Sequence, residues 1–140
     1  MIGLGLALLL CADGHAKPRT GGIPWTCSVD AIFDAATLCK PRAEPGMRLY
    51  VSDVIAQNTT ITAGVFALVS GTGLNCVTST VVILPQTTQG SVRFVAPAST
   101  AAPAILHFSP ALVVGAGQDL CGQGDPSNAV TLQVIGYTAP

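Results

Sequence analysis

Five cysteines are the residues of this chain best suited to chemistry, and their spacing argues against a metal site. They are Cys11, Cys27, Cys39, Cys76 and Cys121. No Cys-x-x-Cys occurs, and His15 and His107 lie far from any cysteine pair, whereas structural zinc sites bring such ligands together at short spacing. A nucleophilic cysteine would need a base, but His107, within AILHFSP, fits a packed or rim histidine of a strand better. Disulfide bonds are the remaining interpretation.

Two cysteine-containing turns have similar sequences. SGTGLNC (70–76) and GAGQDLC (115–121) each place a Gly-x-Gly shortly before Asn or Asp and then Cys. At one end of a sandwich, two such turns would bring their cysteines within the ~4.4–6.8 Å between Cα atoms that a disulfide requires. We therefore expect a Cys76–Cys121 bridge. The Gly-x-Gly is not a dinucleotide fingerprint, because the third glycine and the following helix are missing.

Cys27 and Cys39 form a second candidate pair, in conflict with the local pattern. Residues 28–41 favour a helix, with Ser28 as N-cap and Lys40-Pro41 as stop. Twelve helical steps of ~1.5 Å would separate the two Cα atoms by about 18 Å, too far for a disulfide. Either the helix is one or two turns long with a return loop, or these cysteines do not pair. We expect the short helix and the bridge.

The pairing leaves Cys11 as the odd cysteine, either removed with a signal, free, or bonded between subunits. Disulfides indicate an oxidising setting, which means secretion or a particle exposed outside the cell.

Carboxylates give no clear site. Asp30 and Asp34, four residues apart, are more typical of a cap or solvated face than of a sugar-cleaving pair, which must flank a cleft. Asp119, Asp125 and Asn128 crowd one stretch and could offer calcium oxygen ligands, but the stretch lacks the EF-hand spacing and its final Glu. Turn formation explains them better. We expect a non-enzymatic protein without catalytic residues, metal or cofactor.

From residue 47 onward the pattern is typical of strands, with β-branched residues in short runs separated by Gly, Pro, Asn and Ser. The expected strands span 48–57, 62–70, 76–84, 91–95, 104–108, 112–114 and 129–137. This predicts an all-β fold, an antiparallel β-sandwich of jelly-roll or Greek-key type with an N-terminal arm and one short helix. We expect three parts: an apolar arm or export signal at 1–23, a short helical or loop segment at 24–46, and a β-sandwich domain at 47–140.

The composition favours an assembly. Charged residues make up 9% of the chain, against roughly 25% in ordinary soluble proteins. A surface so poor in charge has little electrostatic defence against association. We expect a homo-oligomer or part of a larger assembly. The chain has no Lys/Arg cluster that would neutralise phosphates, so nucleic acid is not expected as a partner.

The first ten residues are apolar. This run is shorter than the ~20 residues that span a bilayer, so no membrane span is expected. It is either an export signal with a cleavage site before Lys17, or a retained arm that docks on a neighbouring subunit. In the second case the assembly contacts would be Met1, Ile2, Leu4, Leu6, Leu8, Leu9 and Leu10.

Several motifs carry a resemblance: RLYVSDVIAQNTT, SGTGLNC, PASTAAPAILHFSPALVVGAGQDLC and VIGYTAP. Over about residues 48–140 the chain resembles small Gly/Thr-rich β-sandwich proteins of tailed-phage virions, of the decoration or tail-associated type. The resemblance implies a structural subunit that binds the surface of a phage particle, with a capsid or tail protein, or copies of itself, as partner. It implies localisation to the virion.

Two other classes remain open, both placing the chain on the extracellular surface or in secreted form. One is an exported fimbrial or coat-type filament subunit, since Tyr137 resembles the penultimate aromatic residue of chaperone-assembled pilins. The other is a secreted carbohydrate-binding module, which would need exposed aromatic residues on a strand face. Sandwiches host all three functions, so the fold alone does not choose between them.

Overall fold

The computed structural model describes residues 21–31, 36–61, 64–84, 94–96, 98, 102–124 and 130–140. These residues form strands and one 3-10 turn. In chain order they are β1 (Ile23–Ala31), β2 (Thr37–Lys40), β3 (Arg48–Asn58), β4 (Gly64–Thr72), η1 (Leu74–Cys76), β5 (Thr78–Leu84), β6 (Phe94–Ala96), β7 (Ala104–Val113), β8 (Asp119–Gly124) and β9 (Val130–Ala139). The apolar run Met1–Leu10, with its expected assembly contacts, lies outside the described residues.

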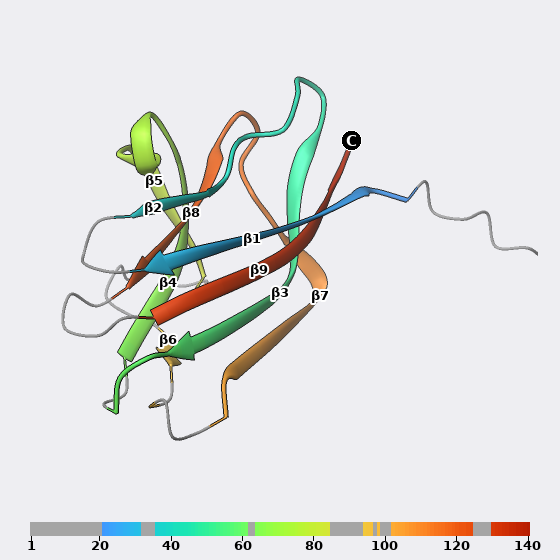
Figure 1. The fold of residues 1–140 in the computed structure, drawn as a ribbon. Helices are drawn as coiled ribbons and strands as arrows, with labels where there is room; N and C mark the ends of the chain where they lie inside the picture. The colour runs from blue at the N-terminus through green and yellow to red at the C-terminus, as the bar shows by residue number, and fades with distance from the viewer. Residues whose placement is uncertain are drawn as a thin grey trace, which may run out of the picture.

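The strands form two antiparallel sheets that pack face to face (Figure 1). Sheet A has the order β1-β9-β3-β7, and sheet B has the order β2-β8-β4-β5. The short strand β6 also pairs with β4, at Gly64–Phe66, ahead of the β5 pairing that begins at Leu68. Strands β1 to β4 alternate between the sheets, and so do β7 to β9, which is the jelly-roll arrangement. The predicted β-sandwich of jelly-roll type is confirmed.

The core lies between the sheets and follows from the period-2 pattern of the strands. Along β3 and β9, buried apolar residues alternate with more exposed ones, because successive side chains of a strand point to opposite faces. Trp25 and Val29 of β1 reach the same core. The other fully or nearly buried members are Leu49, Val51, Val54, Ala56, Phe66, Leu68, Leu84, Leu112, Val114, Leu120, Val130, Leu132 and Val134.

The helix expected within residues 28–41 is wrong in the described part of that segment. Residues up to Ala31 belong to β1, which pairs with β9 from Ile23↔Thr138 to Ala31↔Val130, and Thr37–Lys40 form β2, which pairs with β8. Tertiary pairing overrides the local helical periodicity here, because the ladder buries Val29 in the core while Asp30 stays exposed. Strands β1 and β2 thus belong to the two sheets rather than to a separate helical segment.

Two further expectations about strands need correction. Residues 104–108 and 112–114 were expected as separate strands, but they belong to one strand, β7. Its pairing with β3 is interrupted between His107 and Leu112, where residues 108–111, with Pro110, form a bulge. This is tolerated because β7 is an edge strand of sheet A, where a missing backbone donor breaks no inner ladder. Residues 119–124 were expected as a turn, but they form β8, an inner strand between β2 and β4.

The second predicted disulfide, Cys27–Cys39, is present. It joins edge strand β1 of sheet A to edge strand β2 of sheet B, with 5.5 Å between the two Cα atoms. The conflict between helix and disulfide is resolved because both cysteines lie in strands on either side of a reversal of the chain. The bridge fastens the two sheets together along this side of the sandwich.

Gly136 gives a test of the core packing on β9. A Cβ atom at this position would collide with the backbone oxygen of Tyr50 and lie 2.5 Å from the indole ring of Trp25. Because the backbone cannot yield as a flexible side chain does, Gly136→Ala should destabilise the fold by about 1–3 kcal/mol, the usual cost of overpacking. Denaturant unfolding measures this. The nearby, half-exposed Thr138→Ala is the control and should change the free energy of unfolding by less than about 0.5 kcal/mol; equal effects of the two variants would contradict the close packing.

Candidate functional site

The loop Gly73–Val77, here called the η1 loop, folds against the outer face of sheet B. The strand beneath it, β4, is buried on both faces. Phe66 and Leu68 pack in the main core, whereas Val69 packs with Cys76 and Cys121 in a second, smaller apolar cluster. Partly buried Ala36 and Val82 complete this cluster. The loop therefore adds a third layer outside the sandwich.

The predicted Cys76–Cys121 disulfide is present and holds this layer in place. The two Cα atoms lie 6.3 Å apart, and both cysteines are almost completely buried. Cys76 is the last residue of the η1 turn, as expected. Cys121, which was expected in a second turn, lies instead in strand β8, opposite Val69. The bond thus fastens a loop to an inner strand, instead of joining two loops at one end of the sandwich.

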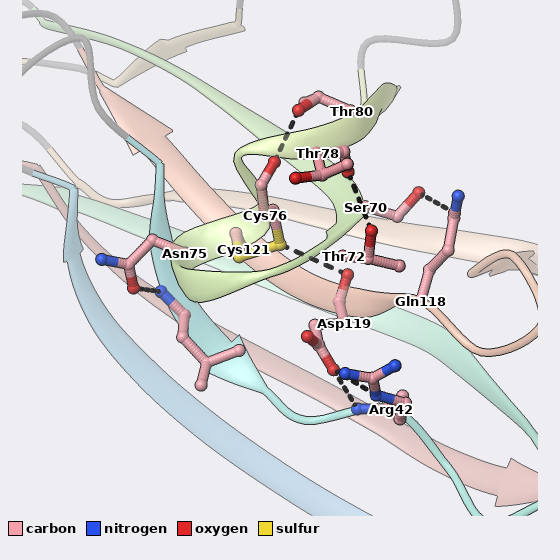
Figure 2. Close-up of a disulfide and its surroundings, with 11 residues drawn as sticks. Arg42, Ser70, Thr72, Asn75, Cys76, Thr78, Thr80, Gln118, Asp119 and Cys121 are labelled. Carbon is pink, nitrogen blue, oxygen red and sulfur yellow. Dashed lines mark hydrogen bonds and ion pairs between the residues drawn. A yellow bond between two sulfur atoms is a disulfide. The ribbon is translucent and has the colours of Figure 1, made fainter.

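Hydrogen bonds hold the loop at several further points (Figure 2). The amide of Leu38, on β2, donates to Asn75 Oδ1 at 3.1 Å. The Thr80 hydroxyl donates to the carbonyl oxygen of Cys76 at 2.5 Å, and the Thr72 hydroxyl donates to that of Thr78 at 3.3 Å. The loop is therefore tied to strands on both sides as well as to the sheet below it.

The backbone of this region adopts a conformation that few residues favour. Asn75, Cys76 and Ser79 have φ values of 53°, 58° and 52°, and Gly73 has 76°. A non-glycine residue in this left-handed region costs roughly 1–2 kcal/mol, so the surrounding contacts must fix the conformation. A loop fixed in this way presents its side chains in one arrangement.

The side chains that the loop presents to solvent are apolar. Leu74 is 81% exposed and Val77 is 73% exposed. Leu38, whose amide is bonded to the loop, is 39% exposed. We call Leu38, Leu74 and Val77 the loop patch. Exposed apolar side chains held by a disulfide and by hydrogen bonds are suited to bind a partner, since little entropy is lost when a rigid surface docks.

The start of β8 is fastened by polar contacts. Asp119 Oδ1 accepts a hydrogen bond from the Arg42 amide at 2.8 Å and lies 3.4 Å from Arg42 Nε. The Ser70 hydroxyl donates to Gln118 Oε1 at 2.7 Å. The Asp119 carboxylate therefore pairs with Arg42. Asp125 and Asn128 lie outside the described residues.

A second polar feature, on the outer face of sheet A, was missed from the sequence. Asp53 on β3 lies opposite His107 on β7, and His107 Nδ1 is 2.7 Å from Asp53 Oδ1. Beside an ionised carboxylate, Nδ1 is the donor and carries the proton. His107 is at the exposed rim, one of the two positions expected for it. Hydrogen bonds from His107 and then Ser52 lower the pKa of Asp53 below its ordinary value.

The remaining candidate residues are not brought together into one site within the described part of the chain. Asp30 lies on β1 and accepts a hydrogen bond from Thr131 at 2.9 Å, while Asp34 is outside the described residues. Within the described ranges, no group of three or more His, Cys, Asp or Glu side chains could hold a metal ion. In the same part of the chain, no helix is sufficiently long and apolar to cross a membrane.

Comparison with protein-family models, curated proteins and solved structures finds no match to this chain. Its function is therefore inferred from its own fold and surfaces.

Replacing both cysteines of one bridge at a time should rank the two disulfides. The Cys76–Cys121 bridge spans 45 residues and the Cys27–Cys39 bridge spans 12. In the chain-entropy treatment, loops of these lengths correspond to about 4 and about 3 kcal/mol. The pair of Cys76→Ala and Cys121→Ala should therefore lower the free energy of unfolding more than the pair of Cys27→Ala and Cys39→Ala. Urea unfolding under oxidising conditions measures both losses; an unchanged stability without Cys76–Cys121 would contradict the role given to it.

The Asp53–His107 pair predicts acid sensitivity. Because the pKa of Asp53 is lower in the folded state than in the unfolded state, its contribution is present above the ordinary aspartate pKa of about 3.9. The contribution is lost as pH falls from there through the folded-state pKa. Asp53→Asn should therefore flatten the dependence of unfolding free energy on pH below about 4. His107→Gln should flatten it partly, since Ser52 remains. Identical pH profiles for the wild type and Asp53→Asn would refute this.

Proposed function

We propose that the protein is a non-enzymatic structural subunit of an extracellular particle, most specifically a decoration or tail-associated protein of a phage virion. The observation that carries this proposal is the loop patch. Leu74 and Val77 are highly exposed, yet the segment between them includes Cys76, which is buried and covalently bonded to β8. Flexible loops usually carry polar tips, and apolar tips held rigidly are typical of docking sites.

The fold is compatible with this function. Jelly rolls with two antiparallel sheets occur in viral capsid proteins, and also in lectins and cupins. The fold therefore supports a capsid-associated role only by analogy. The resemblance of residues 48–140 to small Gly/Thr-rich virion proteins supports the same choice. Together they favour a particle surface over other extracellular settings.

The two disulfides indicate an oxidising environment, as on the outside of a cell or in secreted material. A subunit in this setting cannot rely on cellular chaperones or reductants after assembly. Covalent fastening of the β1–β2 side and of the η1 loop keeps the docking surface intact under these conditions. This supports a structural subunit, whether it decorates a virion or builds an exported filament.

The aromatic residues favour the carbohydrate-binding alternative less than the loop patch favours a structural subunit. Tyr50 and Tyr137 do share the outer face of sheet A, but their rings stack on each other with centroids 4.9 Å apart and planes 5° apart. A sugar-binding platform needs an open ring face. The stacking closes one face of each ring to a sugar, and the Tyr50 hydroxyl donates to the carbonyl oxygen of Pro140 at 3.3 Å.

Density-gradient sedimentation of native material, with mass spectrometry of each fraction, tests the proposal. The chain should be recovered in the band that contains capsid proteins and DNA. The double variant Leu74→Asp and Val77→Asp should lose this association, because a charge in an apolar contact must be desolvated without a partner.

Ile61→Asp is the matched control, since Ile61 is 83% exposed but lies in the turn after β3. This variant should sediment like the wild type. Recovery of the wild-type chain in a DNA-free filament fraction would instead favour the filament subunit. Recovery as a free secreted protein would remove the support for any particle.

A further inference from the structure

We propose that the outer face of sheet A binds the same face of a second copy of this chain, giving a symmetric dimer. This inference deepens the proposed function by naming a partner, and it rests on that function for the setting in which copies meet. Sheet B has its outer face partly covered by the η1 loop, whereas no described residues form such a layer over sheet A (Figure 1).

The register of sheet A places an apolar ring around the Asp53–His107 pair. In one row, Ile55 lies between Ile105 and Gln133; in the next, Asp53 lies between His107 and Ile135. In the third row, Tyr50 lies between Val113 and Tyr137. The apolar members are Ile55, Ile105, Ile135, Tyr50, Tyr137 and Val113, here called the sheet A patch.

The exposure of this patch is unusual for a monomer. Ile105 is 68% exposed and Val113 is 46% exposed, while the other four members are half-buried. Outer faces of antiparallel sheets are ordinarily polar. Contiguous exposed apolar residues, with two tyrosines among them, are characteristic of protein interfaces.

The polar groups at the centre of the patch are paired, which reduces the cost of burying them. The Asp53 carboxylate already has His107 Nδ1 at 2.7 Å. Because these groups keep their hydrogen bonds when water is excluded, burying them costs less than burying unpaired groups. The tyrosine rings are already stacked, so they lose little side-chain entropy on docking.

The face is large enough for a stable contact. Four strands about 4.8 Å apart, each contributing about nine residues at about 3.3 Å, give roughly 570 Å² per copy. Two such faces would bury roughly 1,100 Å², just above the about 1,000 Å² expected of a biological interface. A segment of a few residues would cover only part of this area, which favours a whole second sheet as the occupant.

The charges at the two ends of the face select the symmetry. Arg48 lies in the row of Ala139, at one end of the strands, and Asp30 lies in the row of Thr131, at the other end. A two-fold axis in the interface, perpendicular to the strands, places the Arg48 end of one copy over the Asp30 end of the other. A two-fold axis parallel to the strands would instead superpose like ends. Complementary charge therefore favours the perpendicular axis.

Sedimentation equilibrium of the purified, oxidised full chain tests the dimer. The wild type should reach about twice the 14.2 kDa of one chain as its concentration rises. Ile105→Lys should raise the dissociation constant at least about tenfold, whereas Ile61→Lys, outside the sheet A patch, should not change it. Near-UV circular dichroism confirms that each variant is folded.

The charge pair tests the symmetry separately. Asp30→Arg and Arg48→Asp should each weaken the dimer slightly, and the two substitutions together should restore it, because the swap re-creates opposite charges at the facing ends. Arg48 on β3 and Asp30 on β1 are two strands, about 10 Å, apart across the sheet, so these effects should shrink at high salt. A wild-type chain that stays monomeric at 100 μM concentration, the order of magnitude at which about micromolar contacts are saturated, overturns the proposal.

Self-association through another surface of the chain would give a different pattern of variant effects. Dissociation caused by Leu74→Lys but not by Ile105→Lys would assign self-association to the loop patch and overturn the sheet A interface. Dissociation caused only by removal of residues 1–16 would assign it to the N-terminal segment. Failure of the dimer would leave particle binding in the density gradient unchanged, so this inference and the proposed function fail separately.

Discussion

The Cys76–Cys121 bond fixes the register of β4, which the sequence of this strand leaves open. In β4, Leu68 faces the main core and Val69 faces the second cluster. If β4 shifted by one residue against its neighbours, apolar side chains would still face both clusters. Hydrophobic pattern specifies register only where the two faces of a strand differ. The covalent bond ties the η1 loop to Cys121, opposite Val69, and so selects one pairing of β4 with β8. The second cluster and the position of the loop patch both depend on that choice.

The two sheets treat their outer faces in different ways. Sheet B carries apolar residues outward on β4 and covers them with the η1 loop, at the cost of left-handed backbone at Asn75 and Cys76. Sheet A carries the sheet A patch outward, and the Asp53–His107 pair among these residues is hydrogen-bonded within the sheet. With only 9% charged residues in the whole chain, neither face relies on charge for solubility. The layer over sheet B presents the loop patch to solvent, and the uncovered face of sheet A is the one we propose for contact with a second copy.

Strands β3 to β5, β7 and β9 could be predicted from their local β-branched runs, and the Cys76–Cys121 disulfide from two similar Gly-x-Gly motifs. The Cys27–Cys39 disulfide was expected as the second pairing, against the local helical pattern. Other features could not be predicted because they depend on residues far apart. The segment around Val29 has helical periodicity but is extended by pairing with β9. Strand β8 contains two glycines, and this composition predicted a turn. In the structure Gly122 lies in an inner strand, where the side chains of Val29 and Leu132 fill the space that a Cβ atom would need. Asp53 and His107 are 54 residues apart and meet only through the β3–β7 ladder.

A dimer through sheet A would determine how the loop patches are used. Sheet B of each copy would then face away from the interface, so the two loop patches would point in opposite directions. Two sites arranged in this way cannot bind one flat surface together, and avidity requires that both sites engage at the same time. Such a dimer would instead bridge two partner subunits whose binding surfaces face each other. A monomeric decoration protein would have no such constraint, which makes the oligomeric state of the chain the property that most directly limits how it acts on a particle.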